Sequence, residues 1–397
     1  MTRKRLLILN GSHSEIPLIR AGKSLGYEVI TTGNAPELIG HRFADRYISA
    51  DYSDPDAITE VALQVGADRI CSCANDFGII TAAEVCERLD FPGHDSANTT
   101  RLLHTKDTFK NFARKHKLDT PEAWPLQSLD EALSIIDRLH FPVIVKPVDL
   151  TGGKGVAKVT EISRYRHCVE QAFQLSRKKC IVVEKYIEGK QHSLSTFLVN
   201  GKVVFHYSDN EFSHFNPYYV NASSSPAHQI NTHLPGLLNN IERIAKALHL
   251  VDGVFHVQYL AQSNMAVIID ITRRCSGDMY SAPVSRATGI DWAEWIVKAE
   301  AGHNCHDFPE ARQTGYHGRY CVMGERTGEV AGVTIDPELH PYLIDKLYWW
   351  QQGCRIDDPM NQKVGILFLQ YPSEKVMDDI TRRLPNLVRI QYARKSS

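Results

Sequence analysis

The stretch "VIVKPVDLTGGKGVAKV", from Val143 to Val159, decides the fold. It holds an apolar run that ends in Lys-Pro, a glycine-rich segment with a second lysine, and another apolar run. Glycine-rich loops with a lysine often bind phosphate, but a Walker-type loop needs Ser or Thr after its Gly-Lys and must open a helix. Here Lys154 is followed by Gly155 and then by "VAKVTE", which is typical of a strand. We therefore expect a strand–loop–strand flap rather than a helix-capped phosphate loop.

The predicted flap carries groups that bind phosphate oxygens. Gly152, Gly153 and Gly155 have no side chains, so their backbone N–H groups are open to an anion. Lys146 stands at the end of the preceding strand, where it offers a point charge for phosphate. A surface hairpin with a solvated lysine explains this stretch equally well. Motifs elsewhere in the chain are needed to distinguish the two interpretations.

Length and composition exclude several classes of protein. The chain has 397 residues, more than a single hydrophobic core normally holds, so two or three domains are expected. The net charge of -1 favours neither nucleic acid nor an anionic membrane as a partner. The nine scattered cysteines are typical of reduced thiols, and the apolar run Leu6 to Leu9 is too short for a signal peptide. We expect a cytoplasmic protein.

The first 100 residues alternate between strand and helix patterns. The predicted strands are "RLLILNG", "YEVITTG", "RYISAD" and "DRICSCAND", and the predicted helices between them are "SEIPLIRAGKSLG", "DPDAITEVALQVG" and "GIITAAEVCERLD". This alternation predicts a doubly wound parallel sheet with crossover helices. The loop "NGSHSE" follows the first strand, where such folds bind ligands, but it lacks the GxGxxG spacing of a dinucleotide site.

From residue 101 onward, helices are followed by hairpins. "TKDTFKNFARKHKL" has the pattern of a basic helix, and "QHSLSTFLVNGKVVFHYS" that of a hairpin turning at Asn200-Gly201. Residues 208 to 236 are polar and contain Pro and His, so we expect a long loop over a site. The residues of this loop that can bind an ammonium group or act as a base are Asp209, Glu211, His214 and His228.

Two later strands carry oxygen-bearing side chains that suit a cation. Gln258 in "FHVQYL" and Asp270 in "VIIDIT" pair directly if the hairpin between them turns near Asn264, and they then project from one face. Mg²⁺ takes few protein ligands plus phosphate oxygens, so such a pair fits the end of a nucleotide cleft. We place His256 on the opposite face of its strand, as a packed core residue.

The order of these motifs resembles the ATP-grasp superfamily. A lysine opening a basic helix, "VIVKP" with a glycine flap, "EKYIEG", paired metal-binding strands and a following arginine carry the resemblance, which covers essentially the whole chain. It implies an α/β and α+β fold with a pre-ATP-grasp doubly wound domain at residues 1–100. An ATP-grasp core would follow at 101–302, with a mobile lid at about 125–187, and a small C-terminal α+β domain at 303–397.

The resemblance also implies a role for each matching residue. Lys146 and Arg274 would be the catalytic residues, with Arg274 holding the reacting acyl or carboxy phosphate. The implied ATP-binding residues are Lys106, Lys146, Gly152, Gly153, Lys154, Gly155, Glu184, Lys185, Tyr186, Ile187 and His192. The implied ligands of Mg²⁺, or of Mn²⁺ in its place, are Gln258, Asp270 and Thr272, which stand where the family has Glu, Glu and Asn. With one carboxylate in place of two, the site would hold the cation less tightly.

Substrate groups are expected between the N-terminal sheet edge and the core. The candidate substrate residues are Ser12, His13, Asn75, Asp76, Arg273, Ser276 and Gly277. The segment "TRRCSGDMYSAPVSRATGID" looks more like the amino-acid ligases of the family than like its carboxylases.

The activity that the resemblance implies is ATP-dependent ligation of a small-molecule carboxylate to an amine or amino acid. The carboxylate would attack the γ-phosphate, and an amine would then displace phosphate from the acyl phosphate. One alternative is a bicarbonate-activating carboxyphosphate enzyme of the carboxylase or carbamoyl-phosphate synthase type. Another is a non-catalytic ATP-binding protein, which the departures at Gln258 and Thr272 keep open. The family also favours a homodimer.

Overall fold

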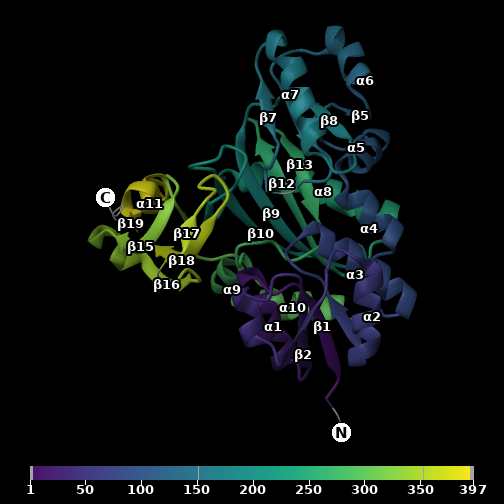
Figure 1. Ribbon diagram of the computed structural model, residues 1–397, viewed down its shortest axis with the longest axis vertical. Coiled ribbons are helices and arrows are strands. Elements are labelled where there is room, and N and C mark those ends of the chain that lie inside the picture. Colours follow the sequence, from purple (N-terminus) through teal and green to yellow (C-terminus); the bar gives the residue numbers. More distant parts are fainter. Residues whose placement is uncertain (1–2, 151, 352, 394–397) are drawn as a thin grey trace.

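The computed structural model describes residues 3–150, 152–351 and 353–393, so the outermost residues of the predicted terminal domains and residue 151 of the flap stretch lie outside the described residues. Figure 1 shows the N-terminal part at the bottom, the predicted lid at the top and the C-terminal part at the left, all joined to a central sheet. No helix in the described ranges is both long and apolar enough to cross a bilayer.

The N-terminal part is a four-stranded parallel sheet, as predicted. Its strand order is β3-β2-β1-β4, with β1 (Arg5–Leu9), β2 (Glu28–Gly33), β3 (Arg46–Ser49) and β4 (Arg69–Cys71). Strand β1 is almost wholly buried because it is a central strand with both faces covered. The connecting helical elements are η1 (His13–Glu15), α1 (Ile16–Ser24), η2 (Ile39–Phe43), α2 (Pro55–Val65) and α3 (Asp76–Leu89). The doubly wound fold class is confirmed.

The lid contains the glycine flap between two paired strands. The four-stranded lid sheet has the order β5-β8-β6-β7, with β5 (Ala123–Leu126), β6 (Val143–Pro147), β7 (Ala157–Val159) and β8 (Ile181–Lys185). Strand β6 pairs antiparallel with β7, so a strand lies on each side of the flap. The lid helices are α6 (Leu129–Ser134), η3 (Ile136–Arg138) and α7 (Ile162–Leu175), and α4 (Ala97–His104) and α5 (Lys106–Lys115) lead into the lid.

The central sheet runs from the core into the C-terminal part. Its eight strands have the order β13-β12-β9-β10-β11-β14-β18-β16. The core strands are β9 (Lys190–Val199), β10 (Lys202–Phe212), β11 (Ala222–Ser225), β12 (Gly253–Ala261) and β13 (Ala266–Thr272). Strand β11 pairs with β14, which lies beyond the predicted boundary at residue 302. The C-terminal wall of the molecule is therefore continuous with the core.

Helices cover the central sheet, and a second small sheet completes the C-terminal part. The core helices are α8 (Ile230–Leu248), α9 (Ser281–Thr288) and α10 (Trp292–Glu300). The C-terminal strands of the central sheet are β14 (Tyr316–Met323), β16 (Leu343–Tyr348) and β18 (Lys363–Tyr371). The remaining elements are β15 (Gly328–Ile335), η4 (Pro337–Tyr342), β17 (Arg355–Ile356), α11 (Glu374–Leu387) and β19 (Val388–Tyr392).

The prediction of a long loop over residues 208–236 is wrong. Residues up to Phe212 belong to β10, Ala222 to Ser225 form β11, and α8 begins at Ile230. The polar side chains misled the sequence reasoning because they are paired inside the sheet. The Asn210 amide, for example, donates to the Ser224 hydroxyl at 3.1 Å in a buried contact.

Arg273 ties the core to the end of the N-terminal part. Its buried guanidinium lies 2.9 Å from Asp95 Oδ2 and donates to the carbonyl oxygens of Val251 and Val254 at 2.6 and 2.5 Å. Each of the three guanidinium nitrogens thus has a partner within the protein. Predicted as a substrate residue, Arg273 is instead placed in a structural ion pair.

We expect Arg273→Ala to lower the melting temperature strongly, because removal of one partner from a buried ion pair costs about 3–5 kcal/mol. For a chain of this size the shift is about 5 °C, measured by differential scanning calorimetry. Arg166→Ala is the matched control, since Arg166 forms only an exposed pair with Glu170. Equal melting temperatures of the two variants would contradict the structural role of Arg273.

Candidate functional site

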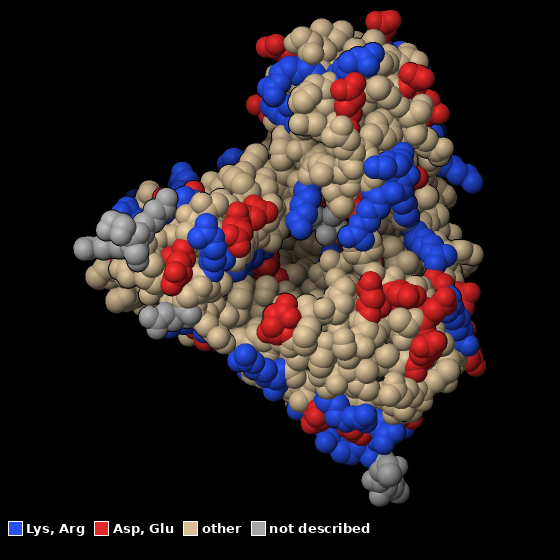
Figure 2. Space-filling view, in the orientation of Figure 1, with Lys and Arg blue, Asp and Glu red and all other residues tan. Residues whose placement is uncertain are grey.

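A cavity of about 610 Å³ lies where the lid, the core and the C-terminal part meet. Figure 2 shows this face hollowed at its centre, with Lys and Arg side chains along the upper rim of the hollow. The lid contributes Lys146 and the flap, the core contributes Gln258 and Asp270, and the C-terminal part contributes Lys363. The fold thus brings predicted site residues from distant parts of the sequence to one space.

Beside the cavity, a buried carboxylate is shared by two lysines. Glu184 Oε1 lies 3.1 Å from Lys110 Nζ and 2.9 Å from Lys146 Nζ. Burial alone would raise the pKa of Glu184, but the two ammonium groups outweigh it and the pKa is lowered. Burial lowers the pKa of Lys110 in spite of this partner. The contacts leave a net positive charge next to the cavity, as a phosphate group requires.

Lys110 was missed by the sequence reasoning. It lies one helical turn after Lys106 on α5, so the (i, i+4) spacing of the two lysines was the available signal. Lys106 lines the cavity, and its Nζ donates to the Leu150 carbonyl at 2.8 Å, at the base of the flap. Lys110 faces Glu184 rather than the cavity. The two lysines of α5 therefore support the flap and the buried carboxylate, respectively.

The flap rests on a second loop that carries two tyrosines. Gly152, Gly153 and Gly155 have φ of 64°, 72° and 72°, a backbone region that favours glycine. A Cβ atom on Gly153 would come within 1.9 Å of the Tyr218 carbonyl oxygen, so the two loops are in direct contact. The Lys158 N–H donates to the Tyr218 hydroxyl at 2.9 Å, which fixes the strand after the flap to the same loop. The flap therefore lies against this loop and lines the cavity.

The end of β8 and the segment after it line the end of the cavity expected to hold adenine. Lys185, Tyr186 and Ile187 all reach the cavity. His192 does not, because it lies on the opposite face of β9, where its ring stacks on Tyr259 at 5.4 Å between centroids. Burial lowers the pKa of His192 to about 4. Gln191, one residue earlier, lines the cavity instead.

The predicted metal ligands lie together on the central sheet. Gln258 pairs with Asp270 across β12 and β13, as predicted, and both line the cavity with Thr272. His256 also lines it, so the prediction that it faces the other side of β12 is wrong; residues two apart on a strand share a face. His256 is nevertheless buried, and its Nδ1 lies 2.7 Å from the Ser195 hydroxyl.

These side chains fit Mg²⁺ bound together with phosphate. Thr272 Oγ1 is buried and has no hydrogen-bond partner in the described part of the chain, so it is an oxygen without an assigned contact. No group of three or more His, Cys, Asp or Glu side chains among the described residues is arranged to hold a metal by itself. A mixed set of carboxylate, amide and hydroxyl oxygens suits a cation whose remaining ligands are phosphate oxygens and water.

Glu211 is a further carboxylate in this part of the cavity. Both of its oxygens accept hydrogen bonds from Gln258 Nε2, at 2.9 and 2.8 Å, and Oε2 also accepts one from Gln191 Nε2 at 2.7 Å. Burial, followed by the charge of Asp209, raises the pKa of Glu211 to about 7. Asp209 is itself buried and accepts a hydrogen bond from the Tyr280 hydroxyl at 3.2 Å.

The two predicted histidine candidates lie elsewhere. His228 lies between two carboxylates of α11, with Nδ1 3.1 Å from Glu374 and Nε2 3.0 Å from Asp378. His214 does not line the cavity either, and burial lowers its pKa. The structure gives neither of them a place beside a bound substrate in this cavity.

Arg274 is anchored at the inner end of the cavity. Its Nε lies 2.8 Å from Asp76 Oδ1, which is also 3.0 Å from His104 Nδ1. Burial would raise the pKa of Asp76, but the Arg274 guanidinium and His104 hold it well below its usual range. Both Arg274 and Asp76 line the cavity, so an oriented guanidinium faces the bound molecule. Three further predicted substrate residues line the same region: Asn75, Ser276 and Gly277.

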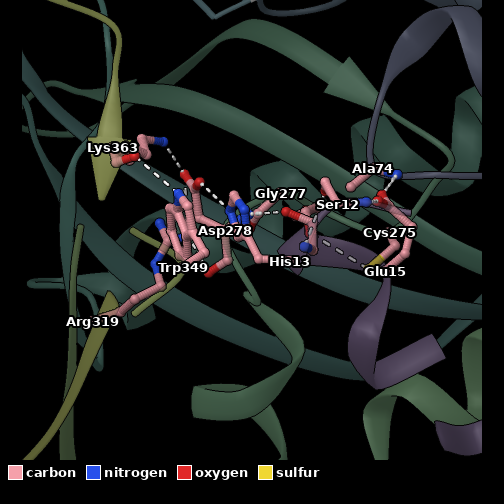
Figure 3. Close-up of polar contacts among 12 residues, drawn as sticks. Ser12, His13, Glu15, Ala74, Cys275, Gly277, Asp278, Arg319, Trp349 and Lys363 are labelled. Atoms are coloured by element: carbon pink, nitrogen blue, oxygen red, sulfur yellow. Dashed lines mark hydrogen bonds and ion pairs between the residues drawn. The ribbon is translucent and has the colours of Figure 1, made fainter. Parts of the chain in front are cut away.

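In the segment after β1, His13 contacts the C-terminal part and only Ser14 reaches the cavity. Figure 3 shows His13 against Trp349, stacked at 3.9 Å between ring centroids, and 3.5 Å from Asp278 Oδ1. Ser12 caps η1 and, like His13, does not line the cavity; Ser14 does. The predicted substrate roles of Ser12 and His13 therefore lack a contact with the cavity.

Asp278 joins the three parts of the molecule at the cavity wall. Its Oδ2 lies 2.5 Å from Lys363 Nζ and 3.7 Å from Arg319 Nη1, both from the C-terminal part (Figure 3). Asp278, Arg319 and Lys363 all line the cavity. The sequence reasoning missed all three, and a φ of 56° at a non-glycine residue such as Asp278 is visible only in the structure.

The fold and the cavity define a nucleotide-binding protein of the ATP-grasp class, with a glycine flap closing over paired lysines. The family model of the carbamoyl-phosphate synthase L chain ATP-binding domain matches residues 105–307. The chain belongs to this family, within the ATP-grasp superfamily.

Individual relatives are distant and differ in their reactions. The carbamoyl phosphate synthase large chain of Clostridium beijerinckii is 21% identical over 304 residues, which are 72% of this chain and 27% of the relative. This chain thus spans about a quarter of the length of that relative. The solved L-amino acid ligase of Bacillus licheniformis superposes with a TM-score of 0.82 at 18% identity, covering 99% of this chain and 100% of the other.

A carboxylase is similar to the same degree. The biotin carboxylase domain of the Hydrogenobacter thermophilus 2-oxoglutarate carboxylase, solved with MgADP and bicarbonate, has a TM-score of 0.78 at 18% identity and covers 98% of this chain and 91% of its own. At these identities the structural likeness establishes the fold alone.

We expect Lys146→Ala to weaken binding of a non-hydrolysable ATP analogue roughly 10- to 100-fold, the value of one or two charge-assisted hydrogen bonds. Lys110 still pairs with Glu184 in this variant, so the buried carboxylate keeps a partner. Isothermal titration calorimetry measures the affinity. Lys178→Ala, at an exposed lid lysine, serves as the control and should bind like the wild type. An unchanged affinity in Lys146→Ala would contradict the phosphate role.

We also expect Gly153→Ala to open the flap, because its Cβ has no room beside Tyr218 and its φ is strained for alanine. Limited trypsin digestion followed by mass spectrometry should then show several-fold faster cleavage after Lys154. Gly236→Ala in α8 is the control, since nothing lies within 4 Å of its Cβ position. Cleavage at the same rate in both variants would show that the flap does not depend on this contact.

Proposed function

We propose that the protein is an ATP-dependent carboxylate–amine ligase that forms an amide bond through an acyl phosphate. The observation that carries this proposal is that the lysines expected to bind phosphate, the oxygens expected to bind a cation and the anchored Arg274 all line one cavity. A kinase-like or carboxylate-activating reaction needs these groups together, because its chemistry depends on positioning and charge neutralisation.

Each group has a defined task in the proposed reaction. Lys146 and the flap amides hold the phosphates of ATP, while Gln258, Asp270 and Thr272 hold a divalent cation that neutralises phosphate charge. A carboxylate oxygen of the acid attacks the γ-phosphorus, and ADP leaves. Arg274, oriented by Asp76, stabilises the acyl phosphate. The amine then attacks the acyl carbon, and phosphate departs with one oxygen of the original carboxylate.

The contact between the flap and the tyrosine loop supports a reaction with a water-sensitive intermediate. An acyl phosphate hydrolyses if water reaches it, so the cavity must be covered while the amine attacks. The contact of Gly153 with Tyr218 supplies such a cover from two sides. The wide range of backbone conformations open to glycine would allow the flap to open for exchange of ATP and ADP.

The C-terminal wall supports an amino acid as one of the two substrates. Lys363 and Arg319 lie on either side of the Asp278 carboxylate, so two cationic side chains line the cavity at this wall. Such a wall attracts a carboxylate that does not itself react, and an amino acid brings one. The amine substrate would therefore carry its own carboxylate group.

A carboxyphosphate reaction is the second candidate. It is favoured by the family model and by the carbamoyl phosphate synthase relative. In this reaction bicarbonate takes the place of the organic acid, and Arg274 would hold carboxyphosphate. A non-catalytic ATP-binding protein is the third candidate, motivated by the neutral side chains of Gln258 and Thr272.

A pairwise screen for ADP release tests these candidates. Purified protein is incubated with MgATP and a panel of carboxylates crossed with amines and amino acids, with bicarbonate as a separate arm. The ligase predicts rapid ADP formation only when a particular acid and a particular amine are both present, with an amide product of the summed mass less water. ADP release driven by bicarbonate, or equal release with and without every amine, would contradict it.

A further inference from the structure

The cation-binding side chains of β12 and β13 carry little negative charge. Gln258 and Asp270 face each other across β12 and β13, but only Asp270 carries a negative charge. A divalent cation is bound more tightly where a second carboxylate adds to the field. Glu211 on β10 stands next to Gln258, in the same cavity, and a cation bound nearby favours its ionised form, which then provides such a charge.

The contact between Glu211 and Gln258 fixes the orientation of the amide. A carboxylate only accepts hydrogen bonds, so Gln258 has to present its Nε2 to Glu211, which it does at 2.9 and 2.8 Å. The amide oxygen Oε1 is then turned away from Glu211. Within the described residues no donor contacts this oxygen, so it is available to a cation.

Glu211 is held in place by a second amide. Gln191 Nε2, on the neighbouring strand β9, donates to Glu211 Oε2 at 2.7 Å. The carboxylate oxygens are thus engaged by two side-chain amides, which suits a carboxylate that orients a ligand better than one that binds the cation directly. A hydrogen bond from Nε2 to an anion also increases the electron density on the amide oxygen and so improves it as a ligand.

We propose that Glu211 is the positioning residue of the cation site, acting through Gln258 to orient its Oε1 toward the cation and supplying the second negative charge. Thr272 Oγ1 on the same face of the sheet is buried and has no hydrogen-bond partner among the described residues, so it independently marks this region as a place for a cation. The proposal rests on the proposed binding of ATP with a divalent cation. It does not depend on which acid or amine is used.

The test measures Mn²⁺ binding by electron paramagnetic resonance in the presence of a saturating non-hydrolysable ATP analogue. Glu211→Gln keeps the shape of the side chain but removes its charge and frees Gln258 to turn. We expect it to weaken Mn²⁺ binding about 10- to 100-fold, the usual effect of losing a residue that orients a metal ligand. Glu188→Gln, which removes an exposed carboxylate from the segment between β8 and β9, should leave the affinity unchanged.

A double variant moves the charge without changing its amount. In Glu211→Gln with Gln258→Glu the carboxylate and the amide exchange places, and we expect most of the Mn²⁺ affinity to return. Gln258→Leu keeps Glu211 but deletes the amide oxygen, and it should bind Mn²⁺ as weakly as Glu211→Gln. The melting temperature of each variant, measured in parallel, separates loss of the cation from loss of the fold.

Three results would overturn the proposal. They are wild-type affinity in folded Glu211→Gln, an exchanged double variant as weak as the single variant, and wild-type affinity in Gln258→Leu. The last result would make Glu211 a direct ligand that acts without Gln258. Because the readout is cation binding rather than turnover, a failure of the acid–amine screen leaves this test intact, and a failure here leaves the ligation proposal to be judged by that screen.

Discussion

The buried carboxylate of Glu184, shared between Lys110 and Lys146, is the interaction on which the rest of the site depends. Removing three charges from water is costly, and the cost is offset only where opposite charges approach to about 3 Å in a fixed frame. That frame joins α5 to strands β6 and β8 of the lid. The same ions that hold the lid against the core therefore leave one positive charge in excess, where phosphate is expected to bind.

One continuous sheet forms a large part of the remaining cavity wall, beside Asn75 and Asp76 of the N-terminal part. Strands β12 and β13 carry the cation-binding oxygens, and β14 and β18 of the same sheet carry Arg319 and Lys363. The hydrogen-bonded strands of this sheet hold these groups in a fixed register, whereas the glycine flap belongs to the separate sheet of the lid and contacts the tyrosine loop across the cavity. The geometry therefore separates a fixed reaction surface from a cover that can open, which is what sequential binding of ATP, acid and amine requires.

The sequence predicted the features that depend on local pattern. Strands on both sides of the flap, and the pairing of Gln258 with Asp270, follow from strand periodicity and hairpin geometry. The predictions that are wrong or missing concern residues whose partners are distant in the chain. Polar residues of β10 were taken for a loop because their buried hydrogen-bond partners are not visible in sequence, and Lys363 reaches Asp278 from 85 residues away. His192 was predicted to reach the cavity, but Gln191 does so instead, because neighbouring residues of a strand point to opposite faces of the sheet.

The central claim is that this cavity activates a carboxylate by transferring phosphate to it. Isotope transfer tests that claim most directly, with the acid found in the pairwise screen labelled with ¹⁸O in its carboxylate. The phosphate released during ligation is then analysed by mass spectrometry. The account predicts one ¹⁸O atom in each phosphate, because the acid oxygen that attacked phosphorus departs with it. Phosphate that carries oxygen from solvent water and none from the acid would contradict the account.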